Sequence, residues 1–246
     1  MAYTDEVLAD GPLGYWRLGA TATTDATGHG YTLTATGTPT AVTGLPPTET
    51  ADGARDIDTP DTDFYTLASG AGAADDFDYE GTASFSVECW VNLRTPGAGE
   101  FERIVAHEDG TNGWLLYYHD TAGIGIGRQR AGSFSLKDEV PSGGTLGSIY
   151  HVVGTYDGAN LRLYLNGTEA GSSLTDTTSI GAFTATLRIG RSPLGGTTGM
   201  NGIVDEVAVY SSALAADRVA THYTAGTSAG GGGASSAANM MMLGVG

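Results

Sequence analysis

The stretch that decides the fold is Tyr150-His-Val-Val-Gly-Thr-Tyr-Asp-Gly-Ala-Asn-Leu-Arg-Leu-Tyr-Leu-Asn-Gly167. Two runs rich in β-branched and aromatic residues lie on either side of Asp157-Gly158, and Asn166-Gly167 ends the second run. Both dipeptides tolerate the positive φ angles of tight hairpin turns. The stretch therefore predicts a meander of at least three antiparallel strands.

A second strand is predicted upstream, over Phe85–Leu93, because its residues alternate between two faces. One face carries Phe85, Val87, Cys89, Val91 and Leu93, and the other carries Ser86, Glu88, Trp90 and Asn92. Cys89 is the only cysteine, so no internal disulfide is expected and this thiol is predicted to lie in the core. With 39 glycines and short alternating runs, the chain is typical of an all-β protein.

The length of 246 residues suits one large sandwich domain. Helix signals occur only at its edges, over residues 4–9 and, after the possible cap Ser212, over residues 213–223 with Gly226 as the terminating residue. We expect a domain over residues 1–226, a Gly/Ser/Ala-rich linker over 227–239 and an apolar, Met-rich peptide over 240–246.

The charge balance narrows the function. The chain has 28 acidic and 11 basic residues and a net charge of −17, which repels phosphate backbones and anionic lipids, so neither nucleic-acid binding nor membrane insertion is expected. The first residues have neither the basic nor the apolar region of a signal peptide. We therefore expect synthesis in the cytoplasm of a host cell.

Several motifs, taken in order, resemble the bacterial and phage laminin-G-like jelly roll from about Ala9 to Gly226. The matching blocks are Leu8-Ala-Asp-Gly-Pro-Leu-Gly-Tyr-Trp-Arg-Leu18, Asp25-Ala-Thr-Gly-His-Gly-Tyr31, Phe85-Ser-Val-Glu-Cys-Trp-Val91, His151-Val-Val-Gly-Thr-Tyr-Asp-Gly158, Leu163-Tyr-Leu-Asn-Gly167, Leu187-Arg-Ile-Gly190 and Gly202-Ile-Val-Asp-Glu-Val-Ala-Val-Tyr210. The resemblance implies an all-β, two-sheet antiparallel jelly-roll sandwich of the concanavalin-A-like type with short terminal helices. The chain departs from the family pattern at His29, where asparagine is usual, and at Ile57-Asp-Thr-Pro60.

The N-terminal block resembles minor tail and other virion proteins of actinobacterial long-tailed phages. This resemblance implies a non-catalytic protein on the exterior of a phage tail or capsid, which binds host cell-wall glycan or neighbouring virion subunits. Repetition on a particle, or a homo-oligomer, would add avidity to weak sites. A cell-surface carbohydrate-binding module and a glycan hydrolase are the alternatives.

Catalysis by a carboxylate pair is not expected. Two carboxylates must lie about 5–9.5 Å apart across a glycosidic bond. Glu88 has Ser86 and Trp90 at the neighbouring positions of its own face, and Asp205 and Glu206 are adjacent, so they should point to opposite faces. We therefore expect the protein not to be an enzyme.

A structural Ca²⁺ is the cofactor that the resemblance implies, since related jelly rolls often hold this ion at the rim of the sandwich. By motif, its ligands would be Asp25, with Asp205 and Glu206. Glycine-rich loops can add backbone carbonyls to such a site. The alternative is an Asx turn at Asp25 and ordinary acidic residues at a strand end.

Glycan recognition needs a flat aromatic ring beside polar groups, because a sugar offers an apolar C–H face and a rim of hydroxyls. The candidates are Trp90, Trp114, Tyr117 and Tyr118. Alternation places Trp114 and Tyr118 on one face and Tyr117 and His119 on the other, so only one set can line an exposed surface. Packing between or against the sheets is the alternative for each ring.

The C-terminal peptide is a further candidate for binding. Met240, Met241, Met242 and Leu243 follow the glycine linker, and methionine adapts to irregular apolar grooves. We expect this peptide to dock into a partner subunit, with disorder as the alternative.

Overall fold

A computed structural model describes residues 1–58, 62–70, 72–94, 100–139, 146–196 and 199–228. The predicted meander is present as β11 (Ile149–Tyr156), β12 (Asn160–Leu165) and β13 (Thr168–Glu169). Asn166 and Gly167 have φ angles of 52° and 79°, as a tight hairpin turn requires. The turn chemistry therefore sets the register of these strands.

The meander is part of a nine-stranded antiparallel sheet. Its main path has the order β13-β12-β11-β6-β16-β4-β3, with β1 paired to β16 and β14 paired to β12. The remaining strands of this sheet are β6 (Phe85–Leu93), β16 (Gly202–Tyr210), β4 (Ala54–Ile57), β3 (Thr40–Val42), β1 (Gly14–Trp16) and β14 (Leu174–Thr175).

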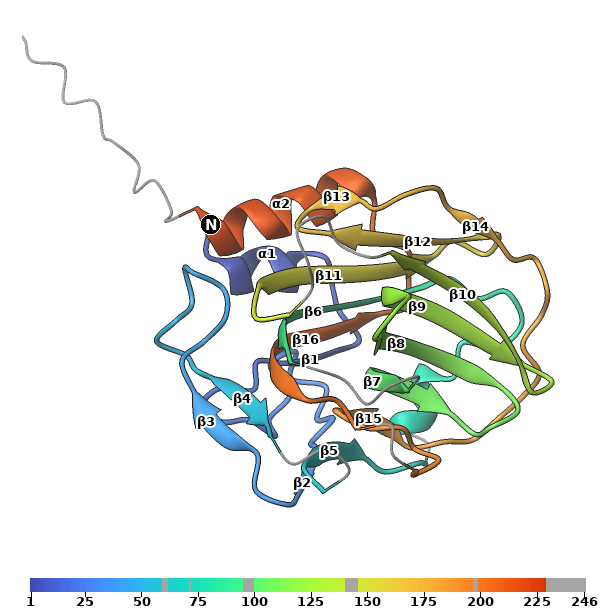
Figure 1. Ribbon diagram of the computed structural model, residues 1–246, viewed down its shortest axis with the longest axis horizontal. Coiled ribbons are helices and arrows are strands. Elements are labelled where there is room, and N and C mark those ends of the chain that lie inside the picture. Colours follow the sequence, from blue (N-terminus) through green and yellow to red (C-terminus); the bar gives the residue numbers. More distant parts are fainter. Residues whose placement is uncertain (59–61, 71, 95–99, 140–145, 197–198, 229–246) are drawn as a thin grey trace, which may run out of the picture.

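A second antiparallel sheet has seven strands in the order β10-β9-β8-β7-β15-β5-β2. These are β10 (Ser133–Glu139), β9 (Gly123–Arg130), β8 (Gly113–His119), β7 (Phe101–Glu108), β15 (Leu187–Ile189), β5 (Phe64–Leu67) and β2 (Thr34–Thr36). A 3-10 helix, η1 (Ala74–Phe77), follows β5. Figure 1 shows the two sheets and their labelled strands. The fold prediction of a two-sheet jelly-roll sandwich is confirmed.

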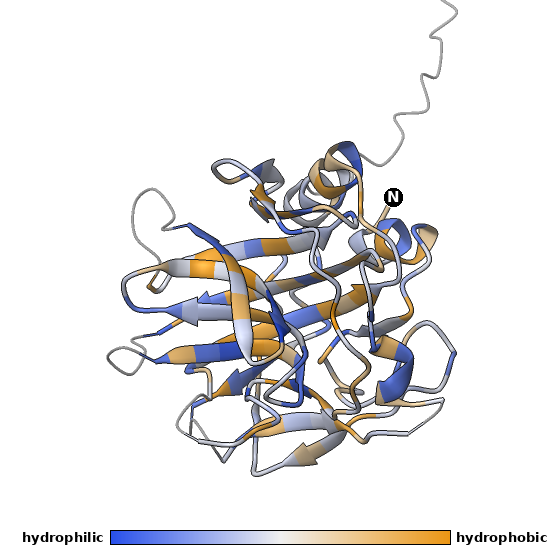
Figure 2. Cartoon of the chain, turned by 90° about the vertical axis from the view of Figure 1, so that its right-hand side faces the viewer, coloured by the Kyte–Doolittle hydropathy of each residue, from blue (hydrophilic) through white to orange (hydrophobic). Residues whose placement is uncertain are grey.

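The hydrophobic core lies between the two sheets. The predicted alternation of β6 is confirmed, since Phe85, Val87 and Cys89 belong to this core and are fully buried. Trp114 and Leu116 of β8 meet them from the other sheet. Figure 2 shows hydrophobic and hydrophilic bands alternating along the strands, as expected when each sheet turns one face inward.

Two helices cover the outer face of the nine-stranded sheet. They are α1 (Tyr3–Ala9) and α2 (Ala216–Thr227), which lie side by side in Figure 1. Leu214 and Val219 are buried with Tyr3 and Trp90 in a second hydrophobic cluster, which lies between the helices and this sheet. No helix in the described ranges is long and apolar enough to cross a membrane.

The bounds predicted for the second helix were wrong. The helix begins at Ala216 rather than at residue 213, and it continues through Gly226 to Thr227. A Cβ atom at Gly226 would lie 2.4 Å from Cζ2 of Trp90, so glycine serves close packing there instead of ending the helix. Ser212 does not cap the helix, because the N-cap position is Ala215. The Ser212 carbonyl instead accepts a hydrogen bond from the Ser86 hydroxyl.

Candidate functional site

The outer face of the seven-stranded sheet carries the candidate site. On β8, Leu115 and Tyr117 point to this face, whereas Trp114, Leu116 and Tyr118 point into the core between the sheets. Gly127 and Gly125 of β9 lie opposite Leu115 and Tyr117. The side chains of these two residues, with those of Leu136 and Asp138 on β10, cover the glycines.

A small apolar groove lies on this outer face. It has a volume of about 80 Å³ and is lined by Phe101, Arg103, Leu115, Phe134 and Leu136. Phe134 is 42% exposed, and it is the aromatic ring among the exposed large apolar side chains of the described residues. The Arg103 guanidinium carbon lies 5.9 Å from the centre of the Phe134 ring. The groove thus offers an accessible aromatic ring next to a charged donor.

Polar groups flank the groove in a connected row. Arg103 Nε donates to Glu108 Oε1 over 2.9 Å, and the Ser192 hydroxyl donates to the same oxygen over 2.9 Å. Gln129, opposite Phe134 in register, donates through Nε2 to the Gly110 carbonyl, while its Oε1 is buried without a hydrogen-bond partner in the described part of the chain. Buried polar atoms without a hydrogen-bond partner are uncommon in folded proteins.

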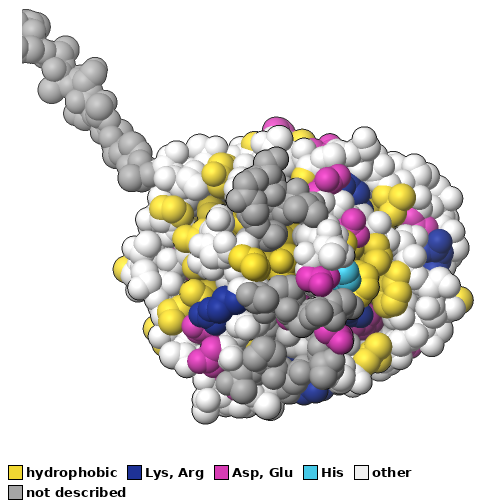
Figure 3. Space-filling model, in the orientation of Figure 1, with side chains coloured by type: hydrophobic (Ala, Val, Ile, Leu, Met, Phe, Trp, Pro, Cys, Tyr) yellow, Lys and Arg dark blue, Asp and Glu magenta, His cyan; other side chains and the backbone are white. Residues whose placement is uncertain are grey.

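Hydrophobic side chains lie beside charged ones on this part of the surface. The right half of Figure 3, where Figure 1 places β8–β10, shows yellow hydrophobic side chains next to acidic and basic ones. A mixed surface of this kind fits a ligand with both apolar and hydroxyl faces.

All four aromatic candidates are buried, so none of them lines an exposed face and the alternative of packing between or against the sheets describes each ring. Trp114 and Tyr118 lie between the sheets, and Trp90 lies under α2, where its ring stacks on Tyr223. Tyr117 does point outward, but it is fully buried and its hydroxyl donates to Asp138 Oδ2 over 2.6 Å. These rings are covered because both faces of β6 and β8 are packed.

Sequence reasoning missed Phe134. Its signal was the alternation Ser133-Phe-Ser-Leu-Lys137, in which Phe134 and Leu136 share a face with few other apolar neighbours along the strand. Its exposure goes with its place on β10, the edge strand of the seven-stranded sheet, which a single sequence does not reveal.

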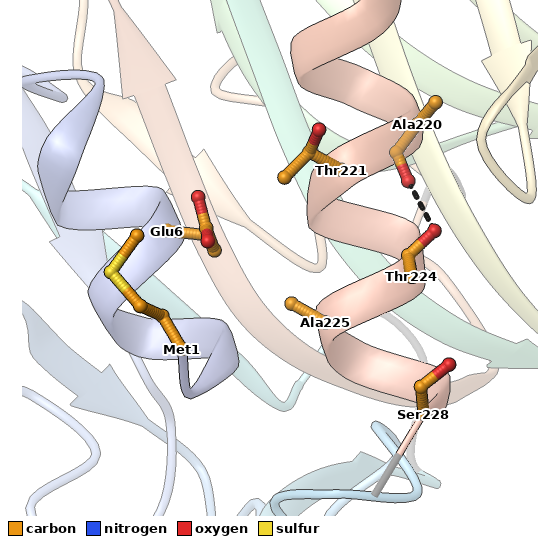
Figure 4. A pocket seen from close by; sticks show the side chains of 7 residues that line it. All are labelled: Met1, Glu6, Ala220, Thr221, Thr224, Ala225 and Ser228. Atoms are coloured by element: carbon orange, nitrogen blue, oxygen red, sulfur yellow. Dashed lines mark hydrogen bonds between the residues drawn. The ribbon is translucent and has the colours of Figure 1, made fainter. Parts of the chain in front are cut away.

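Two larger hollows lack an aromatic lining. One is a cleft of about 380 Å³ between α1 and α2, where Met1 and Glu6 face residues of α2 such as Thr221 and Ala225 (Figure 4). The other, of about 510 Å³, lies at the end of the sandwich, and its lining consists of Thr111, Asn112, Arg130, Ala131, Ser133, Thr178, Ser179 and Gly181. The groove beside Phe134 therefore offers the better-defined recognition surface.

A buried carboxylate dominates the face under the helices. Glu88 accepts hydrogen bonds from the hydroxyls of Tyr3 and Tyr210, both over 2.8 Å, and contacts His151 Nε2 and His222 Nδ1 at 2.7 and 3.0 Å. Burial alone would raise the pKa of Glu88, but His222 and His151 hold this pKa well below its ordinary value. The cluster joins both helices to the sheet.

Asp205 and Glu206 lie on the same helix-covered side, so the prediction that they point to opposite faces was wrong. A bulge in β16 changes the register after Asp205, and Glu206 has a φ of 51°. Asp205 Oδ2 accepts the Leu45 N–H over 2.8 Å, whereas Glu206 accepts from Tyr15 and from Arg17. Burial raises the pKa of Asp205 to about 9 and that of Glu206 to about 7.

The Asp25 carboxylate is used as a hydrogen-bond acceptor by backbone N–H groups of its own loop and of β1. It accepts hydrogen bonds from the N–H groups of Tyr15, Thr27, Gly30 and Tyr31, which form an Asx turn and hold the loop closed. No group of three or more metal-binding side chains gathers in the described ranges. The three predicted ligands thus do not fit a calcium site in this arrangement. Calcium binding stays a prediction, and a melting temperature that falls with chelator and recovers with added Ca²⁺ would establish it.

The C-terminal docking peptide, Met240, Met241, Met242 and Leu243, lies outside the described residues, as do the linker residues from 229 onward.

Comparison with known proteins supports the fold. A structure of domain 4 of AbnA, a GH43 extracellular arabinanase from Geobacillus stearothermophilus, in complex with arabinotriose, is 17% identical, with a TM-score of 0.65, and the match covers 86% of this chain and 98% of that one. The binding domain of Paraclostridial Mosquitocidal Protein 1 is 13% identical, with a TM-score of 0.70 and coverage of 88% and 52%. The botulinum neurotoxin serotype G binding domain is 12% identical, with a TM-score of 0.66 and coverage of 86% and 50%.

The chain thus spans about half the length of these two toxin structures, and at such identities the likeness concerns the fold alone. No curated protein sequence matches the chain. A family model described as the concanavalin A-like lectin/glucanases superfamily matches residues 66–220, which is more than half of the chain. The protein therefore belongs to the laminin-G-like family of that superfamily.

Proposed function

We propose that this protein is a non-catalytic glycan-binding module that uses the outer face of the seven-stranded sheet. The observation that carries the proposal is the exposed Phe134 ring beside Arg103, whose partner Glu108 also accepts from Ser192. A sugar can lay its C–H face on such a ring while its hydroxyls reach the charged groups. The arabinotriose-bound domain of the arabinanase, which shares the fold, supports a carbohydrate ligand.

The engagement of the carboxylates on this face supports a role without catalysis. Glu108 is fully buried and holds Arg103 and Ser192, and Asp138 accepts from Tyr117. A carboxylate used in this way is held as a hydrogen-bond acceptor and is poorly placed to transfer a proton to a glycosidic oxygen. Release of reducing ends from a polysaccharide, abolished by Glu108→Gln, would overturn this part of the proposal.

The binding test is isothermal titration calorimetry, in which soluble oligosaccharides are titrated into the protein. The ligands include arabino-oligosaccharides and host cell-wall fragments. We expect dissociation constants up to the millimolar range for a single shallow site, and Phe134→Ala should weaken binding at least about tenfold. Leu8→Ala is the matched control, because Leu8 is a similarly exposed apolar residue on α1. Equal affinities for wild type and Phe134→Ala would reject the site.

A second variant tests the groove without changing the ring. A Cβ atom at Gly127 would lie 2.5 Å from Leu136 Cδ2 and 3.0 Å from Leu115 Cδ2, so Gly127→Val should displace these two lining side chains and change the shape of the groove. It should reduce glycan affinity while Gly181→Ala, at a roomier position, should not.

The setting we propose is the exterior of a phage particle, in a tail or on a capsid, with other virion subunits as partners. The resemblance of the N-terminal block Leu8–Leu18 to virion proteins supports it. Repetition on a particle would convert millimolar sites into useful avidity. Deleting residues 230–246 should release the protein from particles while leaving the melting temperature of the domain unchanged; normal incorporation would exclude docking by this peptide. A cell-surface carbohydrate-binding module is the alternative setting for the same site.

A further inference from the structure

Among the residues that the structure describes, Arg188 on β15 has no carboxylate partner. It lies opposite Ala106 of β7 and Thr66 of β5 and is half-buried on the outer face of the seven-stranded sheet. Its Nη1 donates to the Ser192 carbonyl over 2.9 Å, and its buried Nε has no hydrogen-bond partner in the ranges that the structure describes. No ion pair to Arg188 occurs within those ranges either. This is unexpected in a chain with a net charge of −17.

A second guanidinium lies beside it. Gly190 has a φ of +92°, and a Cβ there would lie 2.4 Å from Ile57 Cδ1, so only glycine makes the turn that brings Arg191 back toward Arg188. The guanidinium carbons of Arg188 and Arg191 lie 4.8 and 5.3 Å from the centre of the Phe64 ring. Burial, and then the charge of Arg191, lower the pKa of Arg188. The fold thus holds two like charges on one ring.

This pair is continuous with the groove. Ser192, whose carbonyl accepts from Arg188, donates its hydroxyl to Glu108, and Glu108 binds Arg103 at the groove. Across the sheet, Arg188 is opposite Ala106, and Ala106 is opposite Leu115. Two strand spacings, roughly 10 Å, therefore separate Arg188 from Leu115 in the lining of the groove. Four spacings, roughly 19 Å, separate it from β10, which carries Phe134, so the two residues would contact different sugar units of one polymer.

We propose that Arg188 binds an anionic substituent, a carboxylate or a phosphate, of the glycan whose sugar ring lies on Phe134. The ligand class is then an acidic polysaccharide rather than a neutral one. This inference rests on the proposed glycan-binding function. The planar guanidinium can present two parallel N–H donors to a carboxylate or phosphate, and the Phe64 ring under it fixes its plane.

The overall negative charge of the protein opposes a polyanion at long range, but salt screens this repulsion over about 8 Å at physiological ionic strength. A contact at a half-buried arginine is screened much less. Selectivity for the acidic ligand should therefore persist at about 0.15 M salt.

The test compares two polymers with one backbone, polygalacturonate and its methyl ester, against the full chain at about 0.15 M salt. Wild type should bind the acidic form about tenfold more tightly, and Arg188→Gln should remove this difference while keeping the affinity for the ester. Arg162→Gln is the matched control, because Arg162 lies on the other sheet, paired with Asp157 and Glu169. Two further measurements distinguish a carboxylate ligand from a phosphate ligand. One uses inorganic phosphate as a competitor, and the other uses a phosphate-bearing wall polymer as a third ligand.

Equal binding of the two polymers by wild type, or a preference that survives in Arg188→Gln, would overturn the inference. If Phe134→Ala still abolishes binding of the ester in that case, the proposed function stands without it. Wild type that binds neither polymer also rejects the inference, and the oligosaccharide titrations then decide the proposed function separately.

Discussion

The two outer faces of the sandwich differ in what covers them. The nine-stranded sheet is covered by α1 and α2, and Glu88 satisfies two tyrosines and two histidines beneath them. The seven-stranded sheet carries glycines, the exposed Phe134 and a row of polar groups instead. Polar residues on the first face hold the fold together. On the second face the accessible feature is the Phe134 ring, because Arg103, Glu108 and Ser192 beside it are themselves buried. We therefore expect the covered face to govern stability and the other face to carry the proposed recognition.

The comparison predicts the largest loss of stability at Glu88. Glu88→Ala should lower the free energy of unfolding by about 3–5 kcal/mol, because it leaves buried histidines and tyrosine hydroxyls without their acceptor. Urea unfolding measures this, and Glu88→Gln, which keeps the shape, should cost less. A loss of under about 1 kcal/mol for Glu88→Ala would show that the covered face is not held by this carboxylate.

An intermediate effect is expected from pH. The pKa of Asp205 is raised from 3.8 to about 9, by burial and then by Glu206, and that of Glu206 from 4.5 to about 7, chiefly by burial. The folded protein therefore binds more protons than the unfolded chain between these values, so stability falls as the pH rises from about 4 to about 9. The free energy of unfolding should fall by about 1.4 kcal/mol per pH unit for each carboxyl that stays protonated only in the folded state.

In a plot of melting temperature against pH, Asp205→Asn should reduce the decrease on the alkaline side, which we call the alkaline limb. The acid limb should remain, because the pKa of Glu88 is lowered and its contribution to stability is lost only as the pH falls below the ordinary value of 4.5. An alkaline limb unchanged by Asp205→Asn would assign it to other groups.

The smallest effect is predicted on the open face. Phe134→Ala should change the free energy of unfolding by less than about 1 kcal/mol, because the ring is only partly buried. The same variant should remove most of the glycan affinity, as proposed above. A large destabilisation, measured by the same urea titration, would mean that Phe134 is a packing residue and that the two faces do not differ as described.

Local sequence rules predicted the scaffold well. Asp157-Gly158 and Asn166-Gly167 predicted the meander, and alternation in Phe85–Leu93 separated the core face from the face under the helices. These features depend on neighbouring residues, which a single sequence contains. The start of α2 and the role of Gly226 were mispredicted because the helix is set by packing on Trp90, a residue far away in the chain.

The candidate site was harder to predict because exposure depends on what covers each strand. Trp90 and Trp114 are the aromatic residues most suited to sugars by type, yet both are buried. Phe134 is recognisable as an exposed ring only once β10 is known to be the edge strand of its sheet. Adjacent Asp205 and Glu206 point to one side because of a bulge, which the alternation rule does not foresee.

The positions of Met1 and Ser228, the first and last residues that the structure describes, have a consequence for how the protein could be displayed. Met1 and Ser228 line one cleft on the helix-covered side, behind the sheet that carries Phe134. Attachment through either position would therefore present the same surface to solution, and a short peptide joining the two positions should permit circular permutation at the Asp157-Gly158 turn. Immobilisation through either position would thus orient every copy alike, and a coated bead should capture a ligand equally well by either route.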